Sequence, residues 1–338
     1  MQRLFIETQS IKFSRIHCKA YFIMRNFFSL SLSASRRPSF MTNTLLLITI
    51  MLLYPLAGAL LLSLFNGGVQ QSSALLHPDR TMLPLLRMVQ SVGQILMLAL
   101  PVIFLAARHT GRKNPFSLDS LAFLGIKRGV DVGSLALAVG GIFLLQPLLY
   151  TITALQDLYL WPSLGEAGAE VVRQRMVMDA FVKELALVRS VPEFLIVACV
   201  LALTPAVSEE LFFRGYIQQN YTQSLSSGGA VLLTALIFAF FHLSAANLLP
   251  LALLGWYIGY IYSKTGNLVV PFFAHFVNNL AALLFLMVSD GADSLPVLRV
   301  EPLVSTLWWW MVVAASLLLF FMIIQRFSSS LSSKSVVL

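Results

Sequence analysis

The sequence has few charged residues and almost no cysteine. Of its 338 residues, 11% are Asp, Glu, Lys or Arg, and two are cysteines, Cys18 and Cys199. A soluble domain carries about 25% charged residues, so this composition excludes an ordinary soluble protein. The two cysteines are far apart and lack metal-ligand spacing, so the sequence indicates neither a zinc motif nor a disulfide framework.

The chain also lacks a Gly-rich phosphate loop, an internal repeat and, outside its N-terminus, a basic stripe interleaved with aromatic residues. The net charge of +8 therefore does not indicate a nucleic-acid partner, because Lys and Arg in a membrane protein first mark cytoplasmic loops. Hydrophobic residues make up 58% of the chain, against about 45–50% in soluble domains. The composition predicts an all-α, polytopic membrane protein whose first partner is the lipid bilayer.

Eight apolar segments have about the length that crosses the hydrocarbon core of a bilayer. They cover residues 44–65, 88–107, 132–155, 193–216, 229–246, 248–263, 269–288 and 303–324. We expect them to form a helical bundle of about eight transmembrane helices. With a cytoplasmic N-terminus, fifteen Lys and Arg fall on the cytoplasmic side and seven on the other. This bias predicts cytoplasmic termini, with the plasma membrane as the expected location.

The N-terminal extension, residues 1–40, is basic and Ser-rich and has no apolar run of signal-peptide length. Two interpretations stay open: translation begins at Met24 or Met41, or the segment is a targeting or disordered extension. The loop 156–192 mixes apolar and charged residues. It suits an amphipathic helix on the membrane surface or an ordinary solvated helix-loop equally well.

Three further regions follow the extension. Residues 41–189 are expected to hold the N-terminal transmembrane helices and loops. Residues 190–288 carry the polar residues described next. Residues 289–338 are expected to contain the last transmembrane helix and a Ser-rich tail.

Two glutamates and an arginine follow an apolar run, where charge is costly. A charge at the centre of a membrane helix costs about 2.5–3.5 kcal/mol on insertion scales. We therefore expect such a charged residue only where it pairs with another charge, contacts water or has a function. Glu210 and Arg214 are four residues apart and can pair on one helix face. Glu209 lies about 100° round the helix and is left as a carboxylate without a local partner. An unpaired carboxylate in a membrane segment predicts a functional site.

Two of the five histidines, His242 and His275, lie inside apolar runs; we place the other three, His17, His77 and His109, in loops. Asn279 is four residues after His275 and shares its helix face. Taken singly, a buried His is more often structural, and a buried Asn is most often a helix–helix hydrogen bond. Together with Glu209 they come from three apolar segments, and we expect them to converge because each is costly against lipid.

Convergent Glu, His and Asn side chains can hydrolyse a peptide bond. A glutamate can accept a proton from the attacking water, and a histidine can share that water or protonate the leaving amine. A second histidine and an asparagine can stabilise the tetrahedral oxyanion. Two histidines and a glutamate can also hold zinc, so the pattern leaves metal and metal-free chemistry open. No Ser or Cys is placed as a nucleophile; Ser208 and Ser244 are candidates by proximity only.

The three motifs resemble those of a known family. Glu-Glu-x-x-x-Arg at 209–214, Phe-x-x-x-His at 238–242 and His-x-x-x-Asn at 275–279 are similar to the motifs of the CAAX prenyl protease and bacteriocin-processing family of intramembrane proteases. The stretch 255–268 is similar to that family's linker into its last motif. The resemblance covers about residues 190–288.

The resemblance implies an eight-helix-like core around a polar cavity and an endopeptidase acting on a membrane-associated peptide or protein. Prenylated CAAX tails are one implied substrate class, and leader peptides are another. The resemblance also implies one set of catalytic residues: Glu209, Glu210, Arg214, His242, His275 and Asn279.

The resemblance also implies roles. Glu209 would activate the water with His242, the Glu-Arg pair would orient the site, and His275 and Asn279 would stabilise the oxyanion. A mechanism that requires no cofactor is favoured, because asparagine is a poor zinc ligand but a good oxyanion donor. Zinc stays the alternative.

Two other functions stay open. A transporter or proton relay would use the same buried ionisable groups, but the chain lacks the internal repeat and paired broken helices expected of transporters. A non-catalytic immunity or scaffold member of the same family is the second alternative. The filled motif positions argue against it.

Overall fold

The computed structural model describes residues 37–66, 80–290 and 303–332. These residues form helices and the loops between them, with no strand among them, so the all-α prediction is confirmed. The N-terminal half contains α2 (Phe40–Asn66), η1 (Arg80–Met82), α4 (Leu83–Gln94), η2 (Ile95–Ala99), α5 (Leu100–Thr110), α6 (Leu118–Phe123), α7 (Val132–Leu155), η3 (Gln156–Leu160), α8 (Trp161–Ser163) and α9 (Glu166–Leu185). The C-terminal half contains α10 (Val191–Ala198), η4 (Cys199–Leu203), α11 (Thr204–Glu209), η5 (Glu210–Gln218), α12 (Gln219–Tyr221), α13 (Ser227–Phe241), α14 (Leu248–Thr265), α15 (Val269–Asp290) and α17 (Leu307–Ser332).

Six helical stretches are long and apolar enough to cross a membrane, so the chain is a multi-pass membrane protein. They are Phe40–Leu61, Leu83–Thr110, Val132–Ser163, Val191–Tyr221, Val269–Val288 and Leu307–Ser329. The other two predicted spans are also helices, but they are shorter. α13 ends at Phe241 instead of reaching residue 246, and its 15 residues extend about 22 Å, less than the hydrocarbon core. α14 has 18 residues and carries Lys264 in its last turn.

The fourth span, Val191–Tyr221, is not a regular α-helix. It alternates α-helical turns with two π-helical stretches, η4 and η5, and the change from α11 to η5 falls between Glu209 and Glu210. A π-helical segment shifts the register of the side chains that follow it and often occurs at functional sites. The irregularity therefore changes how the two neighbouring carboxylates are aimed.

Two glycines let α14 approach the fourth span and α13 closely, as the Gly255/Gly259 spacing predicts. A Cβ atom at Gly255 would lie 3.0 Å from the Phe238 ring, and one at Gly259 would lie 2.8 Å from the Gln218 side chain. Across this contact Arg214 Nη2 donates to the Gly255 carbonyl and Gln218 Nε2 to the Gly259 carbonyl, both at 3.0 Å. The bare helix surface thus positions the charged part of the fourth span.

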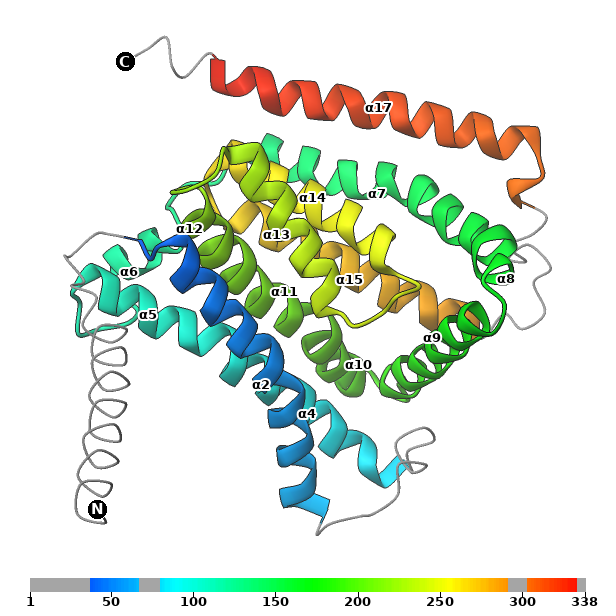
Figure 1. Cartoon of the computed structure of the whole chain (residues 1–338), viewed down its shortest axis with the longest axis horizontal. Coiled ribbons are helices and arrows are strands. Elements are labelled where there is room, and N and C mark those ends of the chain that lie inside the picture. The colour runs from blue at the N-terminus through cyan, green and yellow to red at the C-terminus, as the bar shows by residue number, and fades with distance from the viewer. Residues whose placement is uncertain (1–36, 67–79, 291–302, 333–338) are drawn as a thin grey trace, which may run out of the picture.

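The opposite face of α14 packs against α7, and α17 lies along α7 at the edge of the bundle (Figure 1). Tyr257 on α14 is fully buried, and its hydroxyl donates to backbone carbonyls of α7, 3.1 Å from that of Ala138. At the start of α17, Trp309 Nε1 donates to Thr151 Oγ1 at 3.0 Å. The run of three tryptophans there is typical of a membrane–water interface.

The predicted loop 156–192 is largely helical and contains η3, α8 and α9. Arg175 Nη1 lies 2.7 Å from Asp157 Oδ1, which ties α9 to η3. That α9 rests on the membrane surface stays a prediction.

Most of the predicted N-terminal extension lies outside the described residues, but its end does not. Arg37 Nη1 donates to Asn220 Oδ1 at 3.1 Å, and its guanidinium lies 4.0 Å above the Phe123 ring. Burial lowers the pKa of Arg37 to about 10. This residue therefore ties the start of α2 to α6 and α12.

We expect Gly141→Ala to lower the free energy of unfolding by about 1–3 kcal/mol, because overpacking a filled interior costs this much. A Cβ atom at Gly141 would lie 2.0 Å from the Tyr257 hydroxyl. Thermal unfolding in detergent measures the change. Gly58→Ala on α2 is the control, since nothing lies within 4 Å of its Cβ position; equal losses in both variants would contradict the packing account.

Candidate active site

The centre of the candidate site is a carboxylate shared by two basic side chains. Glu210 Oε1 accepts hydrogen bonds from Arg214 Nη1 and from His275 Nδ1, each at 2.7 Å. All three side chains are buried, with 5% or less of each exposed. Arg214 also donates to the Gly255 carbonyl, and its guanidinium lies over the Phe238 ring, 4.7 Å from the ring centre. The network joins the fourth span to α13, α14 and α15.

The bond to Glu210 fixes the tautomer of His275. A carboxylate can only accept, so Nδ1 carries the hydrogen and Nε2 is left for another partner. Nε2 lies 4.0 Å from Glu209 Oε2. An oxygen atom between these two atoms can reach both at ordinary hydrogen-bond lengths of about 2.8 Å.

Glu209 is buried but incompletely satisfied. It is 6% exposed, and its Oε2 has no hydrogen-bond partner among the described residues. The sequence predicts a carboxylate without a local partner, and in the structure the only ion-pair partner described for Glu209 is His275, from another helix. Neighbouring Ser208 is fully buried, and its hydroxyl also lacks a described partner.

The cluster holds two carboxylates and one guanidinium, and buried charges are costly unless they are paired. Arg214 pairs with Glu210, while Glu209 faces His275 Nε2.

His242 lies at the edge of this group. It follows the last residue of α13, is exposed, and its Nδ1 donates to the Phe238 carbonyl at 2.8 Å. Its Nε2 is therefore left as an acceptor. The ring packs 4.6 Å from Phe238, which also contacts Arg214 and His275. Among the described ion pairs within 4.0 Å, Glu209 has one with His275 and none with His242.

Asn279 is half-buried one helical turn after His275. Its Oδ1 accepts from Asn278 Nδ2 at 3.3 Å, and Asn278 Oδ1 in turn accepts from Gln146 Nε2 at 3.1 Å. No described hydrogen bond joins Asn279 to the Glu210 cluster. The structure thus brings Glu209, Glu210, Arg214 and His275 together and leaves His242 and Asn279 around them.

Sequence reasoning missed two polar side chains near this region. His109 is not in a loop: it lies in the last turn of α5, is 4% exposed, and its Nε2 lies 3.1 Å from the Tyr216 hydroxyl. The apolar run continues up to Ala107, so the helix extends into the basic segment that looked like a loop. Gln146 was missed although it interrupts an apolar run, which is the same signal that singled out His275.

The described cluster offers fewer than the three protein ligands that a catalytic zinc site uses. No group of three or more His, Cys, Asp or Glu in the described residues has metal-binding geometry. His275 Nε2 and Glu209 supply two donors, whereas His275 Nδ1 and Glu210 Oε1 are bonded to each other. Catalytic zinc sites use three protein ligands.

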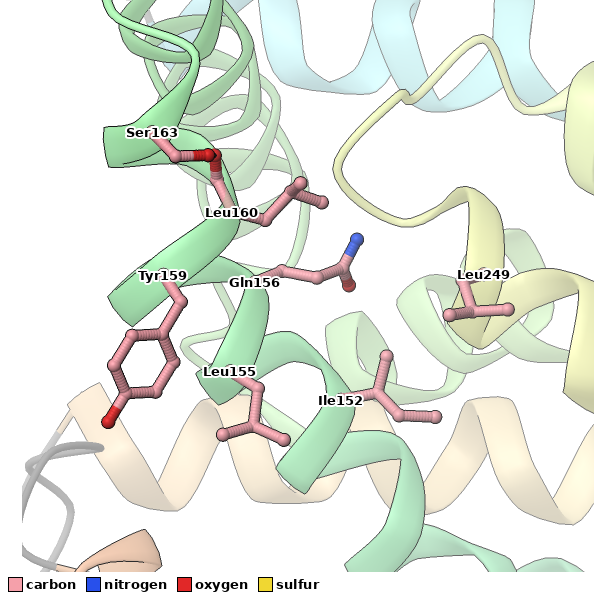
Figure 2. A pocket seen from close by; sticks show the side chains of 7 residues that line it. All are labelled: Ile152, Leu155, Gln156, Tyr159, Leu160, Ser163 and Leu249. Carbon is pink, nitrogen blue, oxygen red and sulfur yellow. The ribbon is translucent and has the colours of Figure 1, made fainter.

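A separate apolar pocket of about 550 Å³ lies beside the loop that follows His242 (Figure 2). It is lined by Ile152, Leu155, Gln156, Tyr159, Leu160, Ser163 and Leu249. In Figure 2 the Gln156 amide points from η3 toward Leu249 in the first turn of α14. Gln156 Oε1 is buried without a described partner, so it can accept from a ligand N–H. None of the six candidate residues lines this pocket.

The network predicts unequal costs for removing its members. We expect Arg214→Met to lower the free energy of unfolding by about 3–5 kcal/mol, because it leaves the Glu210 charge buried and unpaired. Glu209→Gln should change it by less than about 1 kcal/mol, because Oε2 has no partner to lose. Circular dichroism during unfolding in detergent compares the two, and a Glu209 loss as large as the Arg214 loss would refute the assignment.

Part of the chain is similar to a known protein family. No curated protein and no solved structure matches the chain. Residues 191–281 match the family model described as Type II CAAX prenyl endopeptidase Rce1-like. The match begins at the start of α10, ends within α15 and includes all six candidate residues. The match confirms the resemblance drawn from the three motifs: residues 191–281 are similar to the type II CAAX prenyl endopeptidase Rce1-like family.

Proposed function

We propose that the protein is an intramembrane endopeptidase in which Glu209 activates water to hydrolyse a peptide bond. One observation carries the proposal: a buried carboxylate with an unpartnered oxygen faces the free nitrogen of a histidine whose other nitrogen is fixed by Glu210. The family match over the same residues supports a CAAX-type protease. The six candidate spans support a multi-pass location, and we propose the plasma membrane with cytoplasmic termini.

In the proposed reaction, Glu209 takes a proton from water as the water oxygen attacks the scissile carbonyl carbon. The carbonyl oxygen becomes an oxyanion, which the Asn279 amide stabilises as a donor, together with His275 when its ring carries a second proton on Nε2. The proton then passes to the amine as the C–N bond breaks. Glu210 and Arg214 act as positioning residues, since they hold His275 and each other.

Within this proposal His242 shares the attacking water with Glu209. Its bond to the Phe238 carbonyl leaves Nε2 as an acceptor, which suits a water ligand. The proposed steps use no metal, because asparagine is a poor zinc ligand but a good oxyanion donor.

We further propose that the substrate is a prenylated peptide whose apolar group enters the pocket beside α14. The pocket volume of about 550 Å³ falls within the range of about 300–1,000 Å³ typical of ligand sites. Its lining is mostly apolar, and Gln156 offers one acceptor for a peptide N–H. Leader peptides are the competing substrate class.

We expect Glu209→Gln to lower peptide cleavage by about 10²–10⁴-fold, the usual contribution of a general base. The assay follows product formation by wild type and variant in liposomes, with a prenylated peptide and a leader peptide. Glu166→Gln on α9 is the matched control, because that side chain is exposed. Cleavage by Glu209→Gln at the wild-type rate would remove the base assignment.

Filling the apolar pocket should separate the two substrate classes. We expect Leu155→Trp to reduce kcat/KM for a prenylated peptide by about 10-fold or more, because the larger side chain would occupy space needed by the prenyl group. Small size differences in an apolar pocket change kcat/KM by at least this factor. Cleavage of an unprenylated leader peptide should change little. Leu195→Trp is the control, because Leu195 on α10 is 59% exposed and lies outside the pocket. Equal losses on both substrates would contradict the prenyl assignment.

A further inference from the structure

A second cavity, of about 220 Å³, lies where α14 ends and α7 and α15 begin. Three cations line it: Lys127 and Arg128 from the loop before α7, and Lys264 from the last turn of α14. One acid, Asp131, also lines it. We call this cavity the basic pocket. The proposed peptidase does not use it.

The walls of the basic pocket are fixed before any ligand arrives. Asn267, 7% exposed, donates through Nδ2 to the Gly129 carbonyl at 3.2 Å and the Lys127 carbonyl at 3.4 Å. The Leu268 amide donates to the Gly125 carbonyl at 2.8 Å. These bonds hold the loop before α7 against the turn between α14 and α15. Binding in such a pocket loses little conformational entropy.

The basic pocket has an excess of positive charge. The carboxylate of Asp131 caps α7, accepting from the Gly133 and Ser134 amides and from the Ser134 hydroxyl. None of the three cations forms an ion pair with an acid in the described part of the chain. Lys127 Nζ lies 3.2 Å from the position that a Cβ atom of Gly266 would occupy, just after the C-terminal end of α14. A cation at this place interacts favourably with the helix dipole. That local role does not account for Arg128, which is exposed.

The depth of the basic pocket identifies its ligand. The apolar spans that include α7 and α15 start at Val132 and Val269, within a few residues of the pocket lining. Their ends lie where hydrocarbon gives way to headgroups, and phosphate is the abundant anion there. Basic pockets between transmembrane helices bind anionic lipid headgroups, and Lys and Arg form strong charge-assisted bonds to phosphate.

We propose that the basic pocket binds the phosphate group of an anionic phospholipid. It is distinct from the Glu209 site. Lys264 comes nine residues after Gly255, where α14 meets Arg214, a rise of roughly 14 Å along the helix. The bound lipid would tie together α7, α14 and α15, the last of which carries His275.

The test compares lipid binding by wild type and two double variants. Arg128→Gln/Lys264→Gln removes two cations from the pocket and leaves Lys127 in place at the end of α14. Arg112→Gln/Lys113→Gln removes the same charge from exposed positions after α5. Native mass spectrometry and thermal shift in a neutral detergent follow added phosphatidylglycerol, phosphatidylcholine or inorganic phosphate.

We expect wild type and the Arg112/Lys113 variant to retain phosphatidylglycerol at least fivefold better than phosphatidylcholine. The Arg128/Lys264 variant should lose this preference while its melting temperature without lipid stays within a few degrees of wild type. Equal retention by all three proteins, or equal loss in both variants, would overturn the proposal. Stabilisation by inorganic phosphate as large as that by phosphatidylglycerol would assign the pocket to a soluble anion and overturn the lipid source.

Discussion

The shared Glu210 carboxylate is the interaction on which the rest of the site depends. It holds Arg214 through one hydrogen bond and His275 through another, both at 2.7 Å. A buried charge of this kind is tolerable only when it is paired and hydrogen-bonded. Removing Arg214 would leave an uncompensated charge in the bundle, and removing His275 would take away one of the two hydrogen bonds to the carboxylate. Its second effect is chemical, because it turns the free nitrogen of His275 toward Glu209.

The packing of α14 against the fourth span holds Arg214 in place for this interaction. Arg214 and Gln218 reach the backbone of α14 because Gly255 and Gly259 have no side chains in the way. The change from α-helix to π-helix falls between Glu209 and Glu210. Glu210 is hydrogen-bonded to Arg214, whereas Glu209 Oε2 has no described hydrogen-bond partner. Adjacent carboxylates thus have different surroundings.

Much of this arrangement could be predicted from the sequence, because burying charge in a membrane is expensive and leaves a visible pattern. The eight apolar segments, the Glu210–Arg214 pair and the unpartnered Glu209 follow from spacing and cost alone. The π-helical register could not be predicted, since no residue type marks it. The burial of His109 and the contact between His275 and Glu210 were also missed, because both depend on tertiary packing between distant helices.

The central proposal is that Glu209 activates water for peptide-bond hydrolysis without a bound metal. Its most direct test measures the rate at which purified wild-type protein cleaves a peptide substrate after prolonged treatment with a strong zinc chelator. The account predicts that the rate stays within about twofold of the untreated protein, because general-base chemistry needs only the side chains described. Loss of activity that added zinc restores would contradict it and assign Glu209 and His275 to a metal site.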